Sequence, residues 1–206
     1  MSIIAESNPT THYEPIPAGT YLARCYSMVH MGTNVEDIMG EKKELNKVRI
    51  TWELPTEMKI FNEDKGEQPC VISKEFTLSM HEKATLRKYL ESWRGRGFTE
   101  DEARAFDITV LLGKSCMLSI IHKVSKSLKT YAEITGVSSI PKGMNCPPAI
   151  NPEMEFSILN FDAVKFESFP DFIKDKIRSS KEYKAMQSAV VETPTANIEP
   201  EDDLPF

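Results

Sequence analysis

Several short stretches of the chain alternate apolar and polar positions, which is the period-two pattern of a half-buried β-strand. The clearest stretch is residues 45–54, and residues 19–31 and 70–80 show the same alternation. One face of the 45–54 stretch holds Val48, Ile50, Trp52 and Leu54. The pattern predicts three strands, and Pro55 is expected to end the second because proline cannot donate to a ladder.

The segments around these strands are polar or rich in turn-forming residues. Residues 32–44 contain two glycines and end near two lysines, so they predict a loop. Residues 56–69 predict a second polar connection, with a turn at Asp64, Lys65 and Gly66. Residues 1–18 hold three prolines and little periodicity, so an extended arm is expected there.

The middle of the chain changes to helical periodicity. Residues 81–93 carry apolar side chains at helical spacing and predict an α-helix that stops at Gly95. Thr99 and Glu102 have the spacing of a capping box, so a second short helix is expected to start there. Residues 107–114 are apolar and fit either a strand or a short helix.

Strand patterning then returns before the chain ends in a helix. Strands are expected at residues 115–123 and 129–140, and the short basic link between them predicts a hairpin. Residues 141–152 contain four prolines and predict irregular chain. A C-terminal helix is expected to open at Pro170, which is tolerated in a first helical turn, and to reach about Met186.

Five strands with a helix between the third and the fourth are the element order of an OB-fold. The sequence therefore predicts a mainly β protein, a five-stranded OB-fold barrel with that helix and a C-terminal helix. Other small β-barrels with an inserted helix also fit this order. The expected parts are an arm at 1–18, the barrel domain at 19–186 and a polar, acidic tail at 187–206 that is disordered.

The net charge is unevenly distributed. The 206 residues carry 25 basic and 31 acidic side chains, a formal charge of −6. Five acidic and no basic residues lie in the last twenty residues, so the rest of the chain is almost neutral. No stretch approaches the ~20 apolar residues of a membrane span, and the first residues lack the pattern of a secretory signal. We therefore expect a cytoplasmic protein.

Basic side chains gather in two segments of the body. Residues 108–132 contain four lysines and no acidic residue, and residues 82–97 contain five basic and two acidic residues. Locally basic segments are often solvated faces, and this interpretation stays open. The alternative is a basic groove, which attracts a phosphate backbone by releasing counterions, with an acidic interaction tail attached.

The residues that would carry common catalytic or metal chemistry lack the required spacing. The four cysteines form no CxxC pair, so we expect buried, reduced thiols rather than a zinc site. Gly113-Lys114-Ser115 resembles the end of a P-loop, but Ile108 stands where that motif needs its first glycine. The histidines are scattered, and no Ser/His/Asp arrangement stands out. We expect no enzymatic activity, no metal and no cofactor.

A protein that binds single-stranded nucleic acid without sequence preference needs cations for the phosphate backbone and flat aromatic rings for the bases. Trp52 and Trp93 share faces with apolar residues, so core packing is favoured for both, whereas Tyr131 alternates with Ala132 and Ile134 and fits stacking better. The candidate DNA-binding residues are Arg24, Tyr26, Lys47, Arg49, Lys74, Phe76, Arg94, Arg96, Lys114, His122, Lys123, Lys126, Lys129 and Tyr131.

The chain ends in an acidic run followed by an aliphatic residue, a proline and a phenylalanine. Such a tip suits a pocket that takes the aromatic ring and has a basic rim for the carboxylates. An ordinary acidic tail is the alternative. The candidate partner-binding residues are Asp202, Asp203, Leu204, Pro205 and Phe206.

This tip resembles the acidic tip of bacterial single-stranded DNA-binding proteins, which recruits replication and repair proteins and competes with DNA for the basic groove. The body resembles a group of tailed-phage single-stranded DNA-binding proteins with an OB-fold, over about residues 15–186. The matching blocks are AGTY at 18–21, WELP at 52–55, TLSMHEK at 77–83, LESWRGR at 90–96, LGKSC at 112–116 and the helix at 172–183. The resemblance implies a phage-encoded protein in the host cell cytoplasm.

The sequence thus predicts a protein that binds single-stranded DNA without sequence preference and coats it during phage replication or recombination. Its tail is expected to recruit replication or recombination proteins, and no membrane partner is expected. A rival hypothesis is a protein-interaction adaptor of the replication machinery without intrinsic DNA affinity. A nuclease subunit is a second rival, and the missing acidic cluster counts against it.

Overall fold

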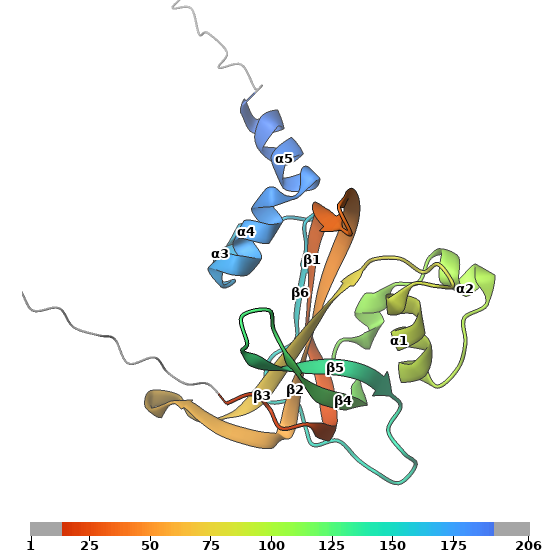
Figure 1. The fold of residues 1–206 in the computed structure, drawn as a ribbon, viewed down its shortest axis with the longest axis vertical. Helices are drawn as coiled ribbons and strands as arrows, with labels where there is room; N and C mark the ends of the chain where they lie inside the picture. The colour runs from red at the N-terminus through yellow and green to blue at the C-terminus, as the bar shows by residue number, and fades with distance from the viewer. Residues whose placement is uncertain (1–13, 192–206) are drawn as a thin grey trace, which may run out of the picture. The chain divides into compact units, whose positions relative to one another are not determined.

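The computed structural model describes residues 14–191 of the chain (Figure 1). The protein is mainly β, with 45 % strand and 25 % helix. The strands are β1 (Gly19–Ile38), β2 (Glu41–Asn62), β3 (Gly66–Thr77), β4 (Ser115–Val124), β5 (Thr130–Ser138) and β6 (Met154–Ser157). The helices are α1 (Thr85–Arg94), α2 (Glu100–Arg104), α3 (Ala163–Glu167), α4 (Asp171–Ser179) and α5 (Lys181–Val191), with 3-10 turns η1 (Glu63–Lys65) and η2 (Ile108–Leu111).

The strands form an antiparallel sheet in the order β3-β2-β1-β4-β5, and β6 pairs with β1. The first three strands form a meander, and β4 returns to pair with β1 before β5 folds back along β4. The sheet curls into a half-barrel with helices α1 and α2 between β3 and β4 and three helices after β5. This is an OB-like arrangement, and the predicted fold class is confirmed.

Two compact units make up the chain. Unit 1 contains residues 14–27, 50–74 and 79–154 of the described chain. Unit 2 contains residues 28–49, 75–78 and 155–191. The long strands β1, β2 and β3 contribute residues to both units.

The core of unit 1 forms around two tryptophans. Trp52 on β2 and Trp93 on α1 are buried, and their ring centroids are 5.8 Å apart. The Trp93 indole Nε1 donates to the Ser115 carbonyl at the start of β4 over 3.0 Å, so both rings pack as the sequence favoured. Burying a large apolar side chain is worth about 1.5–3 kcal/mol. The aliphatic core residues include Ile50, Leu54, Leu86, Leu90, Leu118, Ile120 and Ile134.

The predicted ends of the two short helices are largely confirmed. Helix α1 starts at Thr85, later than the expected residue 81, and Gly95 ends it in a left-handed conformation (φ 71°). Helix α2 starts with the expected capping box. The Thr99 hydroxyl accepts from the Glu102 N–H over 3.2 Å, and the Glu102 carboxylate accepts from the Thr99 N–H over 3.1 Å.

The loop predicted at residues 32–44 is wrong. Strand β1 continues to Ile38 and β2 starts at Glu41, so a two-residue turn joins them. Met39 (φ 57°) and Gly40 (φ 85°) both have positive φ, as a type I′ hairpin turn requires. Methionine at the first turn position conceals this hairpin, because the usual signal is Asn-Gly or Asp-Gly.

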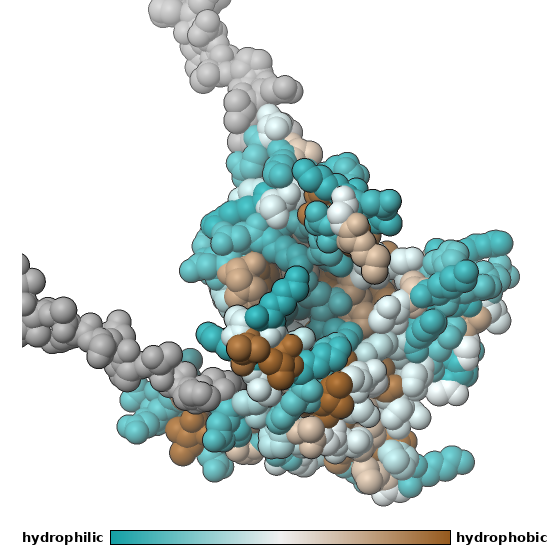
Figure 2. Space-filling model, viewed as in Figure 1, coloured by the Kyte–Doolittle hydropathy of each residue, from teal (hydrophilic) through white to brown (hydrophobic). Residues whose placement is uncertain are grey.

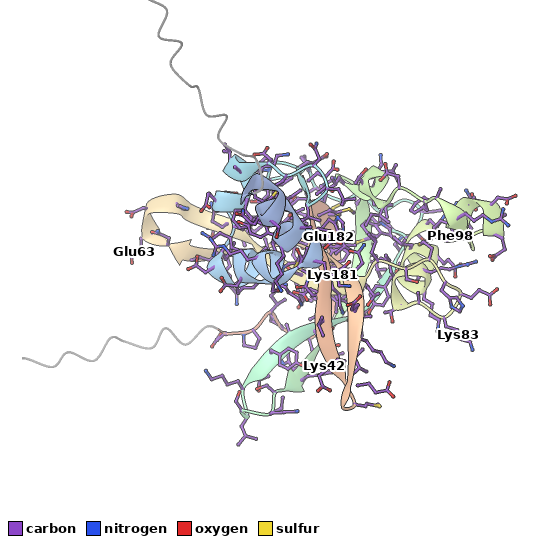
Figure 3. All side chains as sticks on the ribbon, turned by 90° about the horizontal axis from the view of Figure 1, so that it is seen from above. Lys42, Glu63, Lys83, Phe98, Lys181 and Glu182 are labelled. Atoms are coloured by element: carbon purple, nitrogen blue, oxygen red, sulfur yellow. The ribbon has the colours of Figure 1, made fainter. Side chains whose placement is uncertain are left out.

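The β2–β3 hairpin is also longer than predicted. Strand β2 runs through Pro55, so the expected strand end there is wrong, and β3 starts at Gly66 rather than at residue 70. The predicted turn is present, with η1 followed by Gly66 (φ 64°). Most residues near this turn are exposed or half-buried, and Figure 3 shows Glu63 at the end of the hairpin. An exposed hairpin end needs no buried face, so the apolar alternation that identifies strands is missing.

In unit 2, the C-terminal helix expected to start at Pro170 is two helices that meet at Ser180. Helix α5 continues to Val191, past residue 187, where the tail was expected to begin. Residues 1–13 of the expected arm and residues 192–206, which include the partner-binding candidates, lie outside the described residues.

The start of α5 docks on β1 within unit 2 (Figure 3). The Glu182 carboxylate accepts from the Thr33 N–H and from the Thr33 hydroxyl, each over 2.7 Å. Gly32 (φ 74°) lies beside this contact, and a Cβ there would meet Glu182 Oε2 at 2.7 Å and the Ser180 Cβ at 2.8 Å. The close approach of α5 to the strand therefore requires glycine at residue 32.

Candidate nucleic-acid interface

The β4–β5 hairpin of unit 1 gathers the largest group of predicted site residues. Its strands pair in antiparallel register, with Lys123 opposite Tyr131 and Ile121 opposite Glu133. Directly opposed residues point to the same face of the sheet, so these four side chains share one surface. The alternate residues Leu118, Ile120 and Ile134 enter the core, which fixes which face the other four occupy.

The turn of this hairpin is built from backbone and hydroxyl hydrogen bonds. The Ser125 N–H donates to the Lys129 carbonyl over 2.9 Å, and the Leu128 N–H donates to the Ser125 carbonyl over 2.9 Å. Leu128 takes a positive φ of 59°. These bonds hold a short turn, so Lys126 and Lys129 project from a defined loop.

The end of the hairpin combines unpaired cations with exposed apolar side chains. Lys126 and Lys129 are exposed, and neither has an ion-pair partner among the described residues. Val124 is 63 % exposed, Leu128 85 % and the Tyr131 ring 43 %. Figure 2 shows brown apolar side chains beside teal hydrophilic ones over this end of the hairpin. Such a surface offers cations to phosphates and apolar area to bases.

Two further lysines lie on either side of one carboxylate close to the turn of the hairpin. Glu133 Oε2 accepts from Lys123 Nζ over 2.7 Å, and Glu133 Oε1 lies 3.6 Å from Lys74 Nζ. The hydrogen bond from Lys123 lowers the pKa of the Glu133 carboxyl, and the same bond raises the pKa of Lys123. Lys74, Lys123 and Glu133 form what we call the lysine–glutamate cluster.

Lys74 is fixed in place more firmly than Lys123. Its Nζ donates to the Ile134 carbonyl over 2.7 Å and lies 5.4 Å from the centre of the Tyr89 ring. The Tyr89 hydroxyl donates to the same carbonyl over 3.1 Å. Lys74 thereby links β3 to β5, and its side chain is 20 % exposed against 48 % for Lys123.

Lys114 and His122 lie at the two ends of β4. The Lys114 side chain is exposed, next to Gly113, which has φ 71°. His122 is exposed, but its Nε2 lies 2.8 Å from the Ile16 carbonyl. His122 therefore helps to hold the residues before β1, and a groove role is not needed to explain it.

Arg94 and Arg96, the predicted phosphate contacts after α1, are engaged by one glutamate. Glu102 Oε1 accepts from Arg94 over 3.0 Å and from Arg96 over 2.9 Å. The Arg94 guanidinium also lies 4.2 Å from the centre of the Phe98 ring, which Figure 3 labels. The Thr99 N–H and the two arginines lower the pKa of Glu102 to about 2. Arg96 stays 63 % exposed, and Arg94 only 16 %.

Arg24, predicted as a phosphate contact on β1, binds the chain's own backbone instead. Its guanidinium donates to the carbonyls of Gly113 and Pro147, each over 2.7 Å. On β2 the fully buried Glu53 accepts from the N–H groups of Ile150 and Asn151, over 3.0 and 2.8 Å, and from the Asn151 side chain over 2.7 Å. Residues 147–151 therefore lie against Arg24 on β1 and Glu53 on β2, and Tyr26 on β1 is half-buried.

The candidates in unit 2 are also paired or buried. Phe76 is buried, so its prediction as an exposed stacking ring is wrong: the residue lies on the same face of β3 as Ile72, which is also in the core. Lys47 pairs with Glu36 over 2.9 Å. Arg49 pairs with Glu75 over 3.2 Å and lies 5.2 Å from the centre of the Phe172 ring.

Three of the four thiols are buried as predicted. Cys25, Cys70 and Cys116 are buried and Cys146 is half-buried. Burial raises the pKa of Cys25 to about 12 and raises the pKa of Cys116 as well.

Within residues 14–191, no group of three or more His, Cys, Asp or Glu side chains has the geometry to hold a metal ion. None of the helices in this range is both long and apolar enough to cross a membrane.

The sequence missed Glu133 and Tyr89, which shape the cluster. Glu133 could have been noticed in the sequence, because it is the one acidic residue between Ile108 and Pro152.

Comparison of the chain with protein-family models, with curated proteins and with solved structures found no match.

Proposed function

We propose that this protein binds single-stranded DNA without sequence preference through the β4–β5 hairpin. The observation that carries the proposal is the exposed pair Lys126 and Lys129, which has no ion-pair partner among the described residues and lies beside the exposed Tyr131 ring. OB-folds bind oligonucleotides with the face of strands 2 and 3 and with the loops between strands 1 and 2 and between strands 4 and 5. Residues 147–151 contact Arg24 on β1 and Glu53 on β2. This favours the loop between strands 4 and 5 as the binding surface.

The expected contacts follow from the chemistry of a single strand. Phosphates take the lysines of the turn, and one base stacks on Tyr131, an interaction worth about 1–3 kcal/mol. Neither interaction reads a base edge, so binding is expected to be sequence-tolerant. Trp52 and Trp93 take no part, because both rings are buried.

The biological role we propose is to coat and protect single strands in phage replication or recombination, without turnover. The C-terminal residues Asp202 to Phe206 would recruit replication or recombination proteins. This part of the proposal rests on the resemblance of the tip and of the body to single-stranded DNA-binding proteins.

A salt titration tests the binding function. A labelled thymidine oligonucleotide is titrated with the full chain at several salt concentrations and followed by fluorescence anisotropy. Each neutralised phosphate on a single strand contributes about −0.7 to the slope of log Kobs against log salt, so the two turn lysines predict a contribution of about −1.4. A mixed-sequence oligonucleotide should bind within a few-fold of thymidine. No binding, or binding insensitive to salt, contradicts the proposal.

A truncation of the C-terminal tail distinguishes the proposed DNA-binding function from the adaptor hypothesis. A chain ending at Val191 keeps the whole of α5, whereas an end at Gln187 would cut this helix. If the tail competes with DNA for the hairpin, the chain ending at Val191 binds the oligonucleotide more tightly than the full chain. An adaptor without DNA affinity binds in neither form.

A further inference from the structure

Glu133 stands out because its charge opposes its surroundings. The β4–β5 hairpin holds three lysines, Lys123, Lys126 and Lys129, and Glu133 is its one acidic side chain. Like charges on neighbouring strands repel each other, and one carboxylate between them removes that repulsion. The position of the carboxylate therefore shows where an anion is favourable on this hairpin.

The two lysines of the cluster offer donors to that position from both sides. Lys123 and Lys74 approach different oxygens of Glu133, at 2.7 and 3.6 Å. Lys74 is held from behind by the Ile134 carbonyl and the Tyr89 ring, so it stays in place if the carboxylate moves away. Lys123 is 48 % exposed and has room to turn toward solvent.

We infer that the lysine–glutamate cluster is a phosphate-binding site of the β4–β5 hairpin, and that the Glu133 carboxylate occupies it in the free protein. The ligand is a phosphodiester of the nucleic-acid backbone. A phosphate, like a carboxylate, presents oxygens that accept charge-assisted hydrogen bonds from lysine. When a strand binds, a phosphate oxygen replaces Glu133 as the partner of Lys123, and the bound strand passes over Tyr131 on the same face. The inference rests on the proposed function.

Glu133 is thus a positioning residue that limits affinity. In the free protein the Glu133 carboxylate keeps Lys123 in place for a phosphate, and on binding it must release both lysines. Removing its charge should strengthen binding, whereas loss of a residue with a purely supporting role would weaken it.

The test compares Glu133→Gln with a matched charge control. Asp101→Asn removes one negative charge from the exposed Asp101–Arg104 pair on α2, away from the hairpin. Both variants and the wild-type chain are titrated with the labelled thymidine oligonucleotide at several salt concentrations. Glu133→Gln should bind about 3- to 10-fold more tightly at low salt, and its salt slope should stay close to that of the wild type, because the same phosphates are neutralised in both complexes.

A second comparison locates the effect. Lys123→Gln should cost more affinity in the Glu133→Gln background than in the wild-type chain, because no carboxylate then competes for Lys123. The buried tryptophans report folding in every variant through their fluorescence.

The outcomes separate the inference from the proposed function. If the wild-type chain binds and Glu133→Gln binds equally or more weakly, the inference is wrong and the proposed function stands. If Asp101→Asn tightens binding as much as Glu133→Gln, net charge explains the effect and the inference is again wrong. If neither the wild-type chain nor any variant binds, the proposed function itself is wrong.

Discussion

The arginines of residues 82–97 and the turn lysines of the β4–β5 hairpin lie in two similarly basic segments of unit 1, but they differ in how they are paired. In residues 82–97, Arg87 is buried among partners, and Arg94 and Arg96 share Glu102. In the β4–β5 hairpin, Lys126 and Lys129 have no acidic partner within the part of the chain that the structure describes. A count of charges therefore overestimates the cations available to a ligand wherever acidic residues lie within one or two helical turns.

Arg87 is the clearest structural cation of the first segment. Its guanidinium donates to Glu91 over 3.0 Å and to Glu100, the Met80 carbonyl and the Phe98 carbonyl over 3.2 Å each. It joins α1 to the start of α2, so four acceptors each lose one donor if it is replaced. The turn of the hairpin has no equivalent, because Lys126 and Lys129 are exposed and have no ion-pair partner among the described residues.

The largest expected effect is therefore on stability, from Arg87→Met. The substitution should lower the midpoint of urea unfolding markedly, because the Met80 and Phe98 carbonyls and Glu100 lose the guanidinium donor and Glu91 keeps only the Phe98 N–H. Tryptophan fluorescence provides the measurement. The matched control Lys129→Met should change the free energy of unfolding by less than about 0.5 kcal/mol. Equal losses in the two variants would remove the distinction between the segments.

The second largest effect is expected on DNA affinity, from Lys126 and Lys129 in the turn of the hairpin. The double variant Lys126→Gln/Lys129→Gln should weaken binding of the thymidine oligonucleotide about 10- to 50-fold at low salt. Its salt slope should become shallower by about 1.4, since each lost contact removes about 0.7. The control is Lys65→Gln, in the β2–β3 turn among acidic neighbours. A similar loss from Lys65→Gln would show that binding responds only to net charge.

A single ring should have a smaller effect than two cations. Tyr131→Ala is expected to weaken binding about 10-fold, in line with the loss of one stacked base. This loss should persist at high salt, because stacking is not a counterion effect. Tyr131→Phe keeps the ring and should bind nearly as the wild type does. If Tyr131→Phe and Tyr131→Ala lose affinity equally, the ring does not stack.

The smallest expected effect is a pH dependence of the stability that comes from Glu102 and its partners Arg94 and Arg96. The folded pKa of Glu102, about 2, lies below the ordinary value of about 4.3 for a glutamate. A depressed pKa adds stability that is fully present above the unfolded value and is lost as the pH falls through the folded value. Glu102→Gln should therefore be less stable than the wild type at pH 6, and the difference should shrink between pH 5 and pH 2.

Thermal unfolding at several pH values measures this difference. Asp101→Asn, on the same short helix, is the control and should show a smaller dependence on pH. A difference between Glu102→Gln and the wild type that stays constant down to pH 2 would contradict the assignment of the ion pairs.

Local rules predicted much of the fold. The alternation in β2 and β4, the left-handed Gly95 and the Thr99–Glu102 capping box all depend on near neighbours in the chain, and the structure has them. The Met39–Gly40 turn was missed because its residue types are unusual for a type I′ turn, although its geometry is regular.

The site was harder to predict because pairing depends on contacts that are distant in sequence. Nothing near Arg24 indicates that it binds the Pro147 carbonyl, and nothing near Lys74 indicates Glu133 as a partner. Phe76 has the alternation of a strand residue, but the pattern alone does not reveal which face is buried. Exposure and charge pairing are properties of the fold, so the sequence could supply only a list of candidates.

Gly32 has a consequence for how the chain can vary. The hydrogen atom on its Cα leaves the space in which α5 fastens to β1 in unit 2. Any larger substituent would press on Glu182 and Ser180, and the left-handed backbone at this point disfavours other residues as well. The residue type at position 32, which is not among the candidate DNA contacts, therefore decides whether α5 stays attached to β1 within unit 2. Substitutions at residue 32 would therefore be limited by the attachment of α5 to β1 rather than by DNA binding.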